Sequence, residues 1–277
     1  LLISDINSKI PVSLEPNSIQ AIMSGNGNKK GIIEYISDTS LKNKNKDLIV
    51  FTSGMAGLFK SGIPIGRINK ENFFNIDSIG LNSAQKTVLY APSFYPTSLD
   101  QFLPILGRLS YETNIIVKLH NFSWHQKKYI YQSESIQELS KRFNNIYLVP
   151  AQEYNIIPYY GISDILVSDI SSTIFEYLYL DRPIIMADCF NLRLKHRLFR
   201  KRFLKKMDIK RLDSINFTHR LSKPEDLPSL VYYGLEYPLD LKRERLIAQK
   251  EYLFSVDGGA SSRLIDAIDK FILRNRK

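Results

Sequence analysis

The chain contains little sulfur and no long apolar run. Its 277 residues include one cysteine, Cys189. A single cysteine cannot form an internal disulfide, so a reducing compartment is expected and a thiolate metal site is disfavoured. Apolar runs such as residues 115–117 and 184–186 are short, far below the roughly 20 residues that a membrane span requires. We therefore expect a cytoplasmic chain without a membrane-spanning helix.

The start of the chain also lacks familiar signals. Leu1 is not an initiator methionine and no signal-peptide pattern follows it, which is consistent with a start inside a longer protein. Hydrophobic residues make up 44% of the chain and charged residues 24%, as in an ordinary folded protein. The length favours two domains, or one domain and part of another.

The chain has a formal net charge of +10, and the positive charge is concentrated in one segment in which acidic residues are scarce. Residues 195–211 carry nine lysines and arginines opposed by Asp208 alone. Apolar residues recur within this basic segment at helical spacing, so it could form an amphipathic helix on anionic lipid, each cation contributing about 1 kcal/mol. Nucleic acid would satisfy the same charge but is not the expected partner. The third interpretation is a solvated basic face.

Residues 1–70 are predicted to form a small all-β domain. The expected strands are residues 10–14, 18–23, 31–35 and 47–51. Residues 25–28, with the sequence GNGN, supply the positive-φ positions of a hairpin connection. They lack the strand-to-helix context of a dinucleotide-binding loop. Residues 62–66 form a glycine-punctuated end to this region.

From about residue 86 the pattern changes to alternating strands and helices. The expected strands are residues 87–90, 114–119, 146–149, 165–168 and 183–187, and the expected helices are residues 99–110, 133–143, 154–160, 172–180 and 262–273. This alternation predicts an α/β domain over residues 86–277, with a doubly wound parallel sheet covered by helices on both faces. Ligands of such sheets bind outside the carboxyl ends of the strands. The boundary between the two regions is expected between residues 69 and 85.

The richest candidate segment is residues 168–176, with the sequence SDISSTIFE, at a predicted strand-to-helix turn. Ser171, Ser172 and Thr173 would place hydroxyls and free backbone amides at a helix N-terminus, where donors and the helix dipole favour a phosphate. Glu176 lies one turn further and could accept hydrogen bonds from a ribose diol. The alternative is a plain helix cap without any ligand.

Residues 169–176, followed by DRPII at 181–185, resemble the signature of CDP-glycerol glycerophosphotransferases, which build teichoic acid and related polymers. Segments 88–93, 115–120 and 257–263 agree with the same family in order, so the resemblance covers nearly all of residues 87–272. It implies transfer of glycerol phosphate from CDP-glycerol to a polyol-phosphate or glycan acceptor. It also implies a two-domain glycosyltransferase-like fold, of which residues 86–277 would be the donor-binding half.

The resemblance assigns roles to matching positions. The expected substrate-binding residues are Ser171, Ser172 and Thr173 for the diphosphate, Glu176 for the ribose, and Arg263 for a donor phosphate. Lys118 and His120, emerging from a strand end, would be the catalytic residues, because donors there stabilise charge on the phosphoryl group in transfer. A surface salt bridge explains Arg263 almost as well. No metal cluster is visible, and no cofactor is expected.

His120 has a structural alternative, and residue 121 departs from the family pattern. By itself, His120 could be a structural histidine at the edge of the sheet. Asn121 stands where the family usually carries proline, so the path of this loop is expected to differ. Trp124 and His125 are expected to pack rather than act, and His196 and His219 receive no role.

Residues 1–86 contain no histidine, because the four in the chain are His120, His125, His196 and His219. The resemblance implies that a histidine of the acceptor-presenting domain is the base, so the base is not in this region. Residues 3–12, 20–27, 50–55 and 62–66 instead resemble, in order, the β-barrel region of the rod-shape-determining protein MreC. That protein is a periplasmic scaffold of the cell-wall elongation machinery.

The two resemblances imply different compartments. We favour a composite chain that joins a scaffold fragment to a transferase half, because the MreC likeness runs in order over several strands. The alternative is that the β region is a diverged remnant of the acceptor domain. The expected function is that of an incomplete transferase, peripheral on the inner face of the membrane, in which donor binding is better supported than turnover. A non-enzymatic cell-envelope scaffold and a related nucleotide-sugar transferase are the alternatives.

Overall fold

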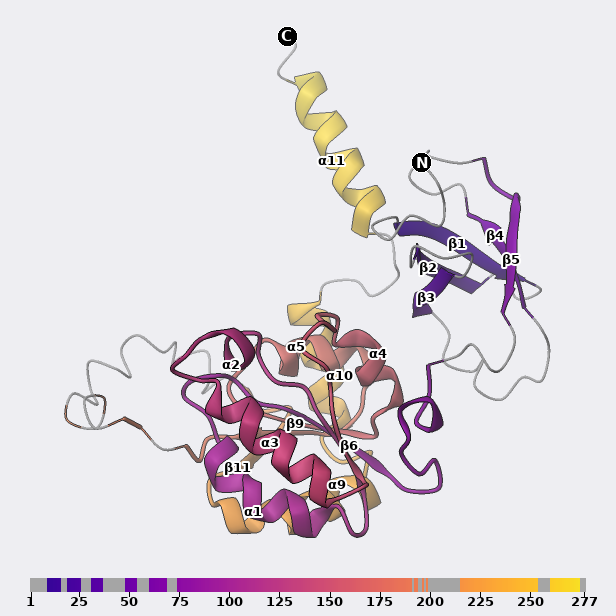
Figure 1. Cartoon of the computed structure of the whole chain (residues 1–277). Coiled ribbons are helices and arrows are strands. Elements are labelled where there is room, and N and C mark those ends of the chain that lie inside the picture. Colours follow the sequence, from indigo (N-terminus) through magenta and orange to yellow (C-terminus); the bar gives the residue numbers. More distant parts are fainter. Residues whose placement is uncertain are drawn as a thin grey trace. The chain divides into compact units, whose positions relative to one another are not determined.

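The computed structural model divides into two compact units, Leu1–Asn75 and Ile76–Lys277 (Figure 1). The structure describes residues 9–15, 19–25, 31–36, 48–53, 60–68, 74–190, 192–193, 196, 198, 215–253 and 260–274. Most of the basic segment, residues 195–211, lies outside the described residues. Within the described part of the chain, no helix combines the length and the apolar character that crossing a membrane would require.

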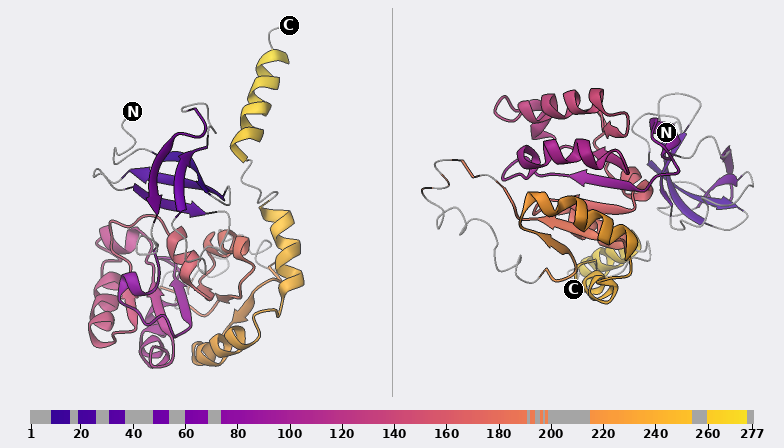
Figure 2. Two further views of the ribbon diagram at one scale, coloured as in Figure 1. Left: turned by 90° about the vertical axis from the view of Figure 1, so that its right-hand side faces the viewer. Right: turned by 90° about the horizontal axis from the view of Figure 1, so that it is seen from below.

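The N-terminal unit is a five-stranded antiparallel sheet, coloured indigo to purple in Figure 2. Its strands are β1 (Lys9–Glu15), β2 (Ile19–Gly25), β3 (Gly31–Ile36), β4 (Leu48–Thr52) and β5 (Pro64–Ile68), in the order β3-β2-β1-β4-β5. Side chains alternate along β1, where Ile10, Val12 and Leu14 are buried in the core of this unit. This alternation is what a sheet with one buried face requires. The four strands predicted in this region are confirmed.

β2 and β3 form the expected antiparallel pair, with Gly25 opposite Gly31. The turn residues 26–30 lie outside the described residues. The sequence interpretation missed β5, because Pro64 and Gly66 are both unfavourable in strands. β5 is an edge strand, and the register against β4 shifts between Val50 and Phe51. Proline is tolerated at an edge because an edge strand has one side without ladder hydrogen bonds.

The second unit contains a six-stranded sheet in which every neighbouring pair is parallel. Its strands are β6 (Thr87–Ala91), β7 (Asn114–Val117), β8 (Ile146–Leu148), β9 (Ile165–Ser168), β10 (Ile184–Ala187) and β11 (His219–Leu221), in the order β11-β10-β9-β6-β7-β8. The strand order reverses between β6 and β9, so this is a doubly wound sheet with a topological switch point there. The predicted fold class is confirmed.

Helices cover both faces of this sheet (Figure 1). The helices are α1 (Leu99–Leu109), α2 (Phe122–His125), α3 (Tyr131–Arg142), α4 (Ile157–Ile162), α5 (Thr173–Tyr177), α9 (Leu227–Glu236), α10 (Lys242–Tyr252) and α11 (Ala260–Arg274), with 3-10 turns η4 (Asp77–Ile79), η5 (Leu178–Leu180) and η6 (Pro224–Asp226). Val88 and Tyr90 of β6 face the core with α1, α3 and α9. Leu89 and Ala91 face the second core, with α4, α5 and α10. Two buried faces explain why β6 reads as a continuous apolar run.

The sequence interpretation missed α2, β11, α9 and α10. In α10, the buried residues are Arg245 and Ala248, so this helix has no apolar stripe that could reveal it. The predicted C-terminal helix is confirmed as α11, whose large apolar side chains are exposed, including Leu264 and Phe271.

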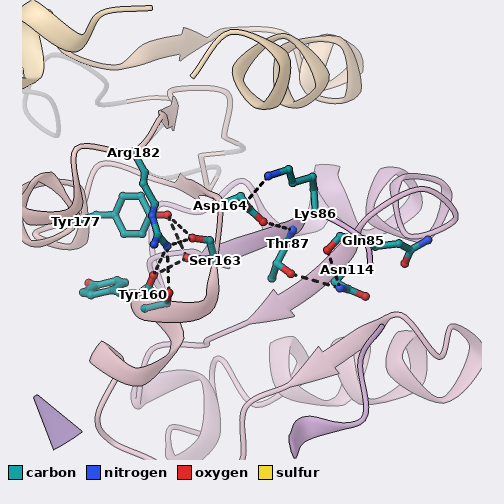
Figure 3. A network of polar contacts seen from close by, with 10 residues as sticks. Gln85, Lys86, Thr87, Asn114, Tyr160, Ser163, Asp164, Tyr177 and Arg182 are labelled. Carbon is teal, nitrogen blue, oxygen red and sulfur yellow. Dashed lines mark hydrogen bonds and ion pairs between the residues drawn. The ribbon is translucent and has the colours of Figure 1, made fainter. Parts of the chain in front are cut away.

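A polar network joins the amino ends of the central strands (Figure 3). The Asp164 carboxylate accepts hydrogen bonds from the Thr87 backbone N–H at 2.8 Å and from Lys86 Nζ at 3.0 Å. Asn114 Nδ2 donates to Thr87 Oγ1 at 3.3 Å. These contacts fix the edge of the sheet opposite to the one where ligands of doubly wound folds bind. We therefore assign the contacts of Lys86, Thr87, Asn114 and Asp164 a structural role.

Candidate active site

The carboxyl ends of β7, β6 and β9 lie side by side, because β6 pairs with both of the other strands. Adjacent strands are about 4.8 Å apart, so β7 and β9 are separated by about 10 Å. Lys118 directly follows β7, and Asp169 directly follows β9. The segment that carries Lys118 and His120 and the turn that carries Ser171, Ser172 and Thr173 thus leave the same edge, on either side of β6.

Lys118 is half-buried where the chain leaves β7. Its backbone N–H still donates to the Tyr90 carbonyl at 2.9 Å. Desolvation lowers the pKa of the Lys118 amine, and the charge of Glu153 partly opposes that shift. A partly desolvated ammonium interacts more strongly with an anion than a fully hydrated one does.

His120 is held by its neighbours in one tautomer. Its Nδ1 accepts a hydrogen bond from the Phe122 backbone N–H at 3.1 Å, and its ring packs against Phe94, with centroids 4.7 Å apart. Desolvation and the nearby Lys118 charge lower the pKa of His120, so the ring is neutral at pH 7. With Nδ1 as acceptor, the hydrogen is on Nε2. His120 therefore offers a donor rather than a base. Asn121 is the N-cap residue of α2.

The turn between β9 and α5 leaves backbone donors available. Among the described residues, the N–H groups of Ser171 and Ser172 have no hydrogen-bond acceptor. Ser172 is the exposed N-cap residue of α5 and makes no side-chain capping bond. The Ser171 hydroxyl accepts a long bond of 3.4 Å from the Thr173 N–H. Ser172 thus occupies the N-cap position of the plain-cap alternative without making a side-chain capping bond.

The Thr173 hydroxyl is directed back toward the sheet. Ser168 Oγ donates to the Ala91 carbonyl at 2.6 Å, which uses its one hydrogen. The contact of 2.8 Å between Ser168 Oγ and Thr173 Oγ1 must therefore have Thr173 as the donor. This hydroxyl holds the turn against β6 and β9 and has no hydrogen left for an anion.

Asp169 connects this turn to the loop that follows β6. Its buried carboxylate accepts hydrogen bonds from the backbone N–H groups of Ser93, at 2.9 Å, and Ser98, at 3.1 Å, as well as from the Ser98 hydroxyl. Burial raises the pKa of Asp169 to about 6, although these hydrogen bonds lower it. Phe94 of the same loop packs on His120, so the loop bridges both halves of the site. The sequence interpretation gave Asp169 no role of its own.

Glu176 is exposed on α5, and one of its carboxylate oxygens already has a partner. Tyr160 Oη, from α4, donates to Glu176 Oε2 at 2.9 Å. The sequence interpretation did not identify Tyr160, because nothing in the spacing of residues 160 and 176 indicates that two different helices bring them together.

Arg193 lies near the same loop and was also missed. Its guanidinium carbon is 4.2 Å from the ring centroid of Tyr95 and 4.9 Å from that of Tyr129. Tyr129 in turn packs against Phe94, with centroids 5.2 Å apart, and Tyr95 Oη lies 2.6 Å from His196 Nδ1. The cation–π contacts hold a positive charge beside the β6 loop.

The remaining predicted residues are Arg263, Trp124 and His125. Arg263 lies in the first turn of α11, beyond residues 254–259, which are outside the described part. Its role toward a donor phosphate stays a prediction. Trp124 packs against the core as expected, whereas His125 is exposed in α2, so the expectation that His125 packs is wrong. Among the described residues, no cluster of three or more histidine, cysteine or acidic side chains could hold a metal ion.

Solved structures with a similar fold include sugar and polymer transferases. The wall teichoic acid polymerase TagF matches with 22% identity and a TM-score of 0.44, over 73% of this chain and 47% of that one. A glycosyltransferase from Rickettsia africae matches with 18% identity and a TM-score of 0.44, over 70% and 49%. A UDP-forming trehalose-phosphate synthase from Burkholderia vietnamiensis matches with 11% identity and a TM-score of 0.46, over 65% and 41%. The chain thus spans less than half the length of the polymerase it matches.

No curated protein matches the chain. Two family models match it, and they overlap. Residues 1–93 match the barrel core of the rod-shape-determining protein MreC, which confirms the predicted resemblance of the N-terminal region. The structure places β6, which lies within that match, at the centre of the parallel sheet of the second unit.

The second family model covers residues 69–270, most of the chain, and describes CDP-glycerol:poly(glycerophosphate) glycerophosphotransferase. It spans all six parallel strands and the edge at which Lys118, His120 and the β9–α5 turn emerge. The chain therefore belongs to the CDP-glycerol:poly(glycerophosphate) glycerophosphotransferase family.

Proposed function

We propose that this chain binds CDP-glycerol at the carboxyl edge of the parallel sheet, for transfer of glycerol phosphate to a polyol-phosphate or glycan acceptor. The observation that carries the proposal is that two groups of hydrogen-bond donors lie on either side of β6, at the switch point of the sheet. The amides of Ser171 and Ser172, which have no acceptor among the residues that the structure describes, lie on one side of β6, and Lys118 and His120 lie on the other. A diphosphate offers acceptors to both groups of donors.

In the proposed reaction, an acceptor hydroxyl oxygen attacks the phosphorus that carries glycerol. A new P–O bond forms to the acceptor while the bond from that phosphorus to the bridging oxygen breaks, and cytidine monophosphate leaves with the electron pair. The Ser171 and Ser172 amides and hydroxyls would hold the diphosphate. Lys118 and His120 Nε2–H would stabilise negative charge on the transferring phosphoryl group. Such electrostatic stabilisation is the main way in which a protein catalyses phosphoryl transfer.

The proton of the acceptor hydroxyl needs a base, and His120 is not suited to that role because its Nδ1 is occupied by the Phe122 N–H. Residues 1–86 contain no histidine. We therefore propose that the chain by itself binds the donor with little or no turnover, the base having to come from elsewhere. In this proposal the Thr173 hydroxyl does not bind the diphosphate. Thr173 contributes through its backbone, and its side chain holds the turn in place.

Calorimetric titration with CDP-glycerol tests the proposal. We expect saturable heat from the wild-type chain, weakened about tenfold by the combined Ser171→Ala and Ser172→Ala substitutions, because each hydroxyl would lose a hydrogen bond to a charged group. Ser83→Ala, which changes an exposed serine before β6, is the matched control and leaves the affinity unchanged. Other nucleotide diphosphate donors, titrated in parallel, distinguish a related nucleotide-sugar transferase.

The second candidate function concerns the N-terminal unit alone. The match of residues 1–93 to the MreC barrel core and the five-stranded antiparallel sheet favour a cell-envelope scaffold role in cell shape, through protein partners. A chain that serves only as a scaffold would give no saturable heat with CDP-glycerol.

A peripheral position on the inner face of the membrane is a further part of the proposal, supported by the charge of residues 195–211. Sedimentation with liposomes tests it. We expect binding that requires anionic lipid and weakens with salt, and binding that ignores lipid charge would contradict it.

A further inference from the structure

A buried tyrosine and an exposed carboxylate meet on the face of the sheet that carries α4 and α5. Tyr160 Oη donates to Glu176 Oε2 at 2.9 Å. Tyr160 is only 5% exposed, whereas Glu176 is exposed. Burial, and then the charge of Glu176, raises the pKa of Tyr160 far above its ordinary value. The phenol therefore stays protonated and acts as the donor in this bond.

The position of Tyr160 is fixed from several directions (Figure 3). Its ring packs edge-on against Tyr177, with centroids 5.4 Å apart and planes at 74°. Tyr177 Oη in turn contacts Ser163 Oγ at 3.1 Å. The Tyr160 carbonyl accepts a hydrogen bond from Arg182 at 3.2 Å. Tyr160 is therefore a rigid support, while the glutamate it holds is a flexible side chain that would otherwise sample several rotamers.

The bond leaves most of the Glu176 carboxylate available. A carboxylate has two oxygens and about four acceptor positions, and Tyr160 occupies one of them. Among the described residues, Tyr160 is the hydrogen-bond partner of Glu176, whose Oε1 is left open. A vicinal diol presents two adjacent hydroxyl donors, which match the free positions of one oriented carboxylate.

We propose that Tyr160 is a positioning residue that orients Glu176 toward the ribose diol of the nucleotide donor and so sets the preference for ribose over deoxyribose. This inference rests on the proposed function, in which Glu176 faces the donor ribose. Holding the carboxylate in its bound orientation before the ligand arrives removes part of the ordering cost of binding. The gain applies only to ligands that carry the diol.

Titration with a matched pair of ligands tests this inference. The probes are CDP-glycerol and its 2′,3′-dideoxy analogue, which lacks both hydroxyl donors. The wild-type chain should bind CDP-glycerol about tenfold or more tightly than the analogue, since two hydrogen bonds to a charged group are lost. Tyr160→Phe should weaken CDP-glycerol about three- to tenfold, the effect of losing one such positioning contact, and should leave the analogue unchanged. Glu176→Ala should abolish the preference.

Tyr159→Phe is the matched control, because Tyr159 is a buried tyrosine on the same helix, and its ring stacks on Tyr147. It should leave the preference intact. Unfolding midpoints of both variants show whether either change loosens α4. A purely structural Tyr160 would weaken both ligands equally on substitution, and that result would overturn the inference, as would an unchanged preference.

The failure of this inference can be distinguished from failure of the proposed function. A wild-type chain that binds CDP-glycerol without preferring it over the analogue overturns the role of Tyr160 alone. A wild-type chain with no saturable binding of either ligand overturns the proposed function and this inference with it.

Discussion

The two units of the chain differ in what they bury. In the described part of the N-terminal unit, the buried polar side chains are Ser24 and Thr52, neither of which is ionisable. The α/β unit buries Asp169 and Arg245 almost completely. Burying a charged side chain is costly unless it is hydrogen-bonded. Buried charged side chains are therefore expected where they hold loop backbone that apolar packing alone does not hold. The first unit is organised by an apolar core, and the second by two such cores and by charges that anchor its loops.

The largest effect that this comparison predicts is at Arg245. Its guanidinium is 1% exposed, pairs with Asp181 at 2.9 Å and donates to the carbonyls of Pro238 and Asp240. Arg245→Ala should lower the free energy of unfolding of the α/β unit by about 3 kcal/mol or more, because partners of a buried charge lose their bonds. Chemical denaturation followed by circular dichroism measures this loss.

The control for Arg245 is Lys242→Ala, since Lys242 pairs with the same Asp181 carboxylate at 3.5 Å but is half-exposed. Its loss should cost less than about 1 kcal/mol. Equal effects of the two substitutions would remove the distinction between buried and surface charge on which the comparison rests.

The second prediction is a pH dependence confined to the α/β unit. Burial raises the pKa of Asp169 to about 6 in the folded chain, against about 3.9 when unfolded. Between these values the folded state holds a proton that the unfolded state has released. The contribution of Asp169 is therefore most favourable below about pH 4 and is lost as the pH rises toward 6, by roughly 3 kcal/mol.

Asp169→Asn does not titrate and isolates this contribution. The free energy of unfolding of the wild-type chain, relative to that of the variant, should fall as the pH rises from about 4 to about 6. A difference that stays flat across this window would show that Asp169 is not desolvated in the folded chain.

The sequence was sufficient for five of the six strands of the parallel sheet, all but β11, but not for the contacts that shape the edge of the sheet. Continuous apolar runs such as residues 88–91 identified the central strands, because both faces of a doubly wound sheet are buried. β5 was hidden by Pro64, and α10 by the lack of a regularly spaced apolar stripe, since its apolar residues Leu246, Ile247 and Ala248 are consecutive. Tyr160 and Asp169 could not be assigned from spacing, because each acts through a residue on a different element, which only the fold brings near.

The third and smallest predicted effect separates the two edges of the parallel sheet. Lys118→Met, at the carboxyl edge, should weaken binding of CDP-glycerol about tenfold, or about 1.4 kcal/mol, by removing a partly desolvated cation. Lys86→Met, at the amino edge, removes a lysine whose side chain is 64% exposed and whose partner is Asp164. It should leave the affinity unchanged and alter stability by less than about 1 kcal/mol. Titration calorimetry measures both, and equal losses would contradict the assignment of the site to one edge.

Hydrogen–deuterium exchange with and without CDP-glycerol tests most directly whether the backbone of the β9–α5 turn binds the donor. We predict slower exchange in peptides that contain Ser171 and Ser172 and in those that contain Lys118 and His120, because bound phosphate oxygens engage or cover these groups. Peptides from β1 to β4 should not change. Exchange that stays the same around Ser171 and Ser172 while the ligand is bound would contradict the account.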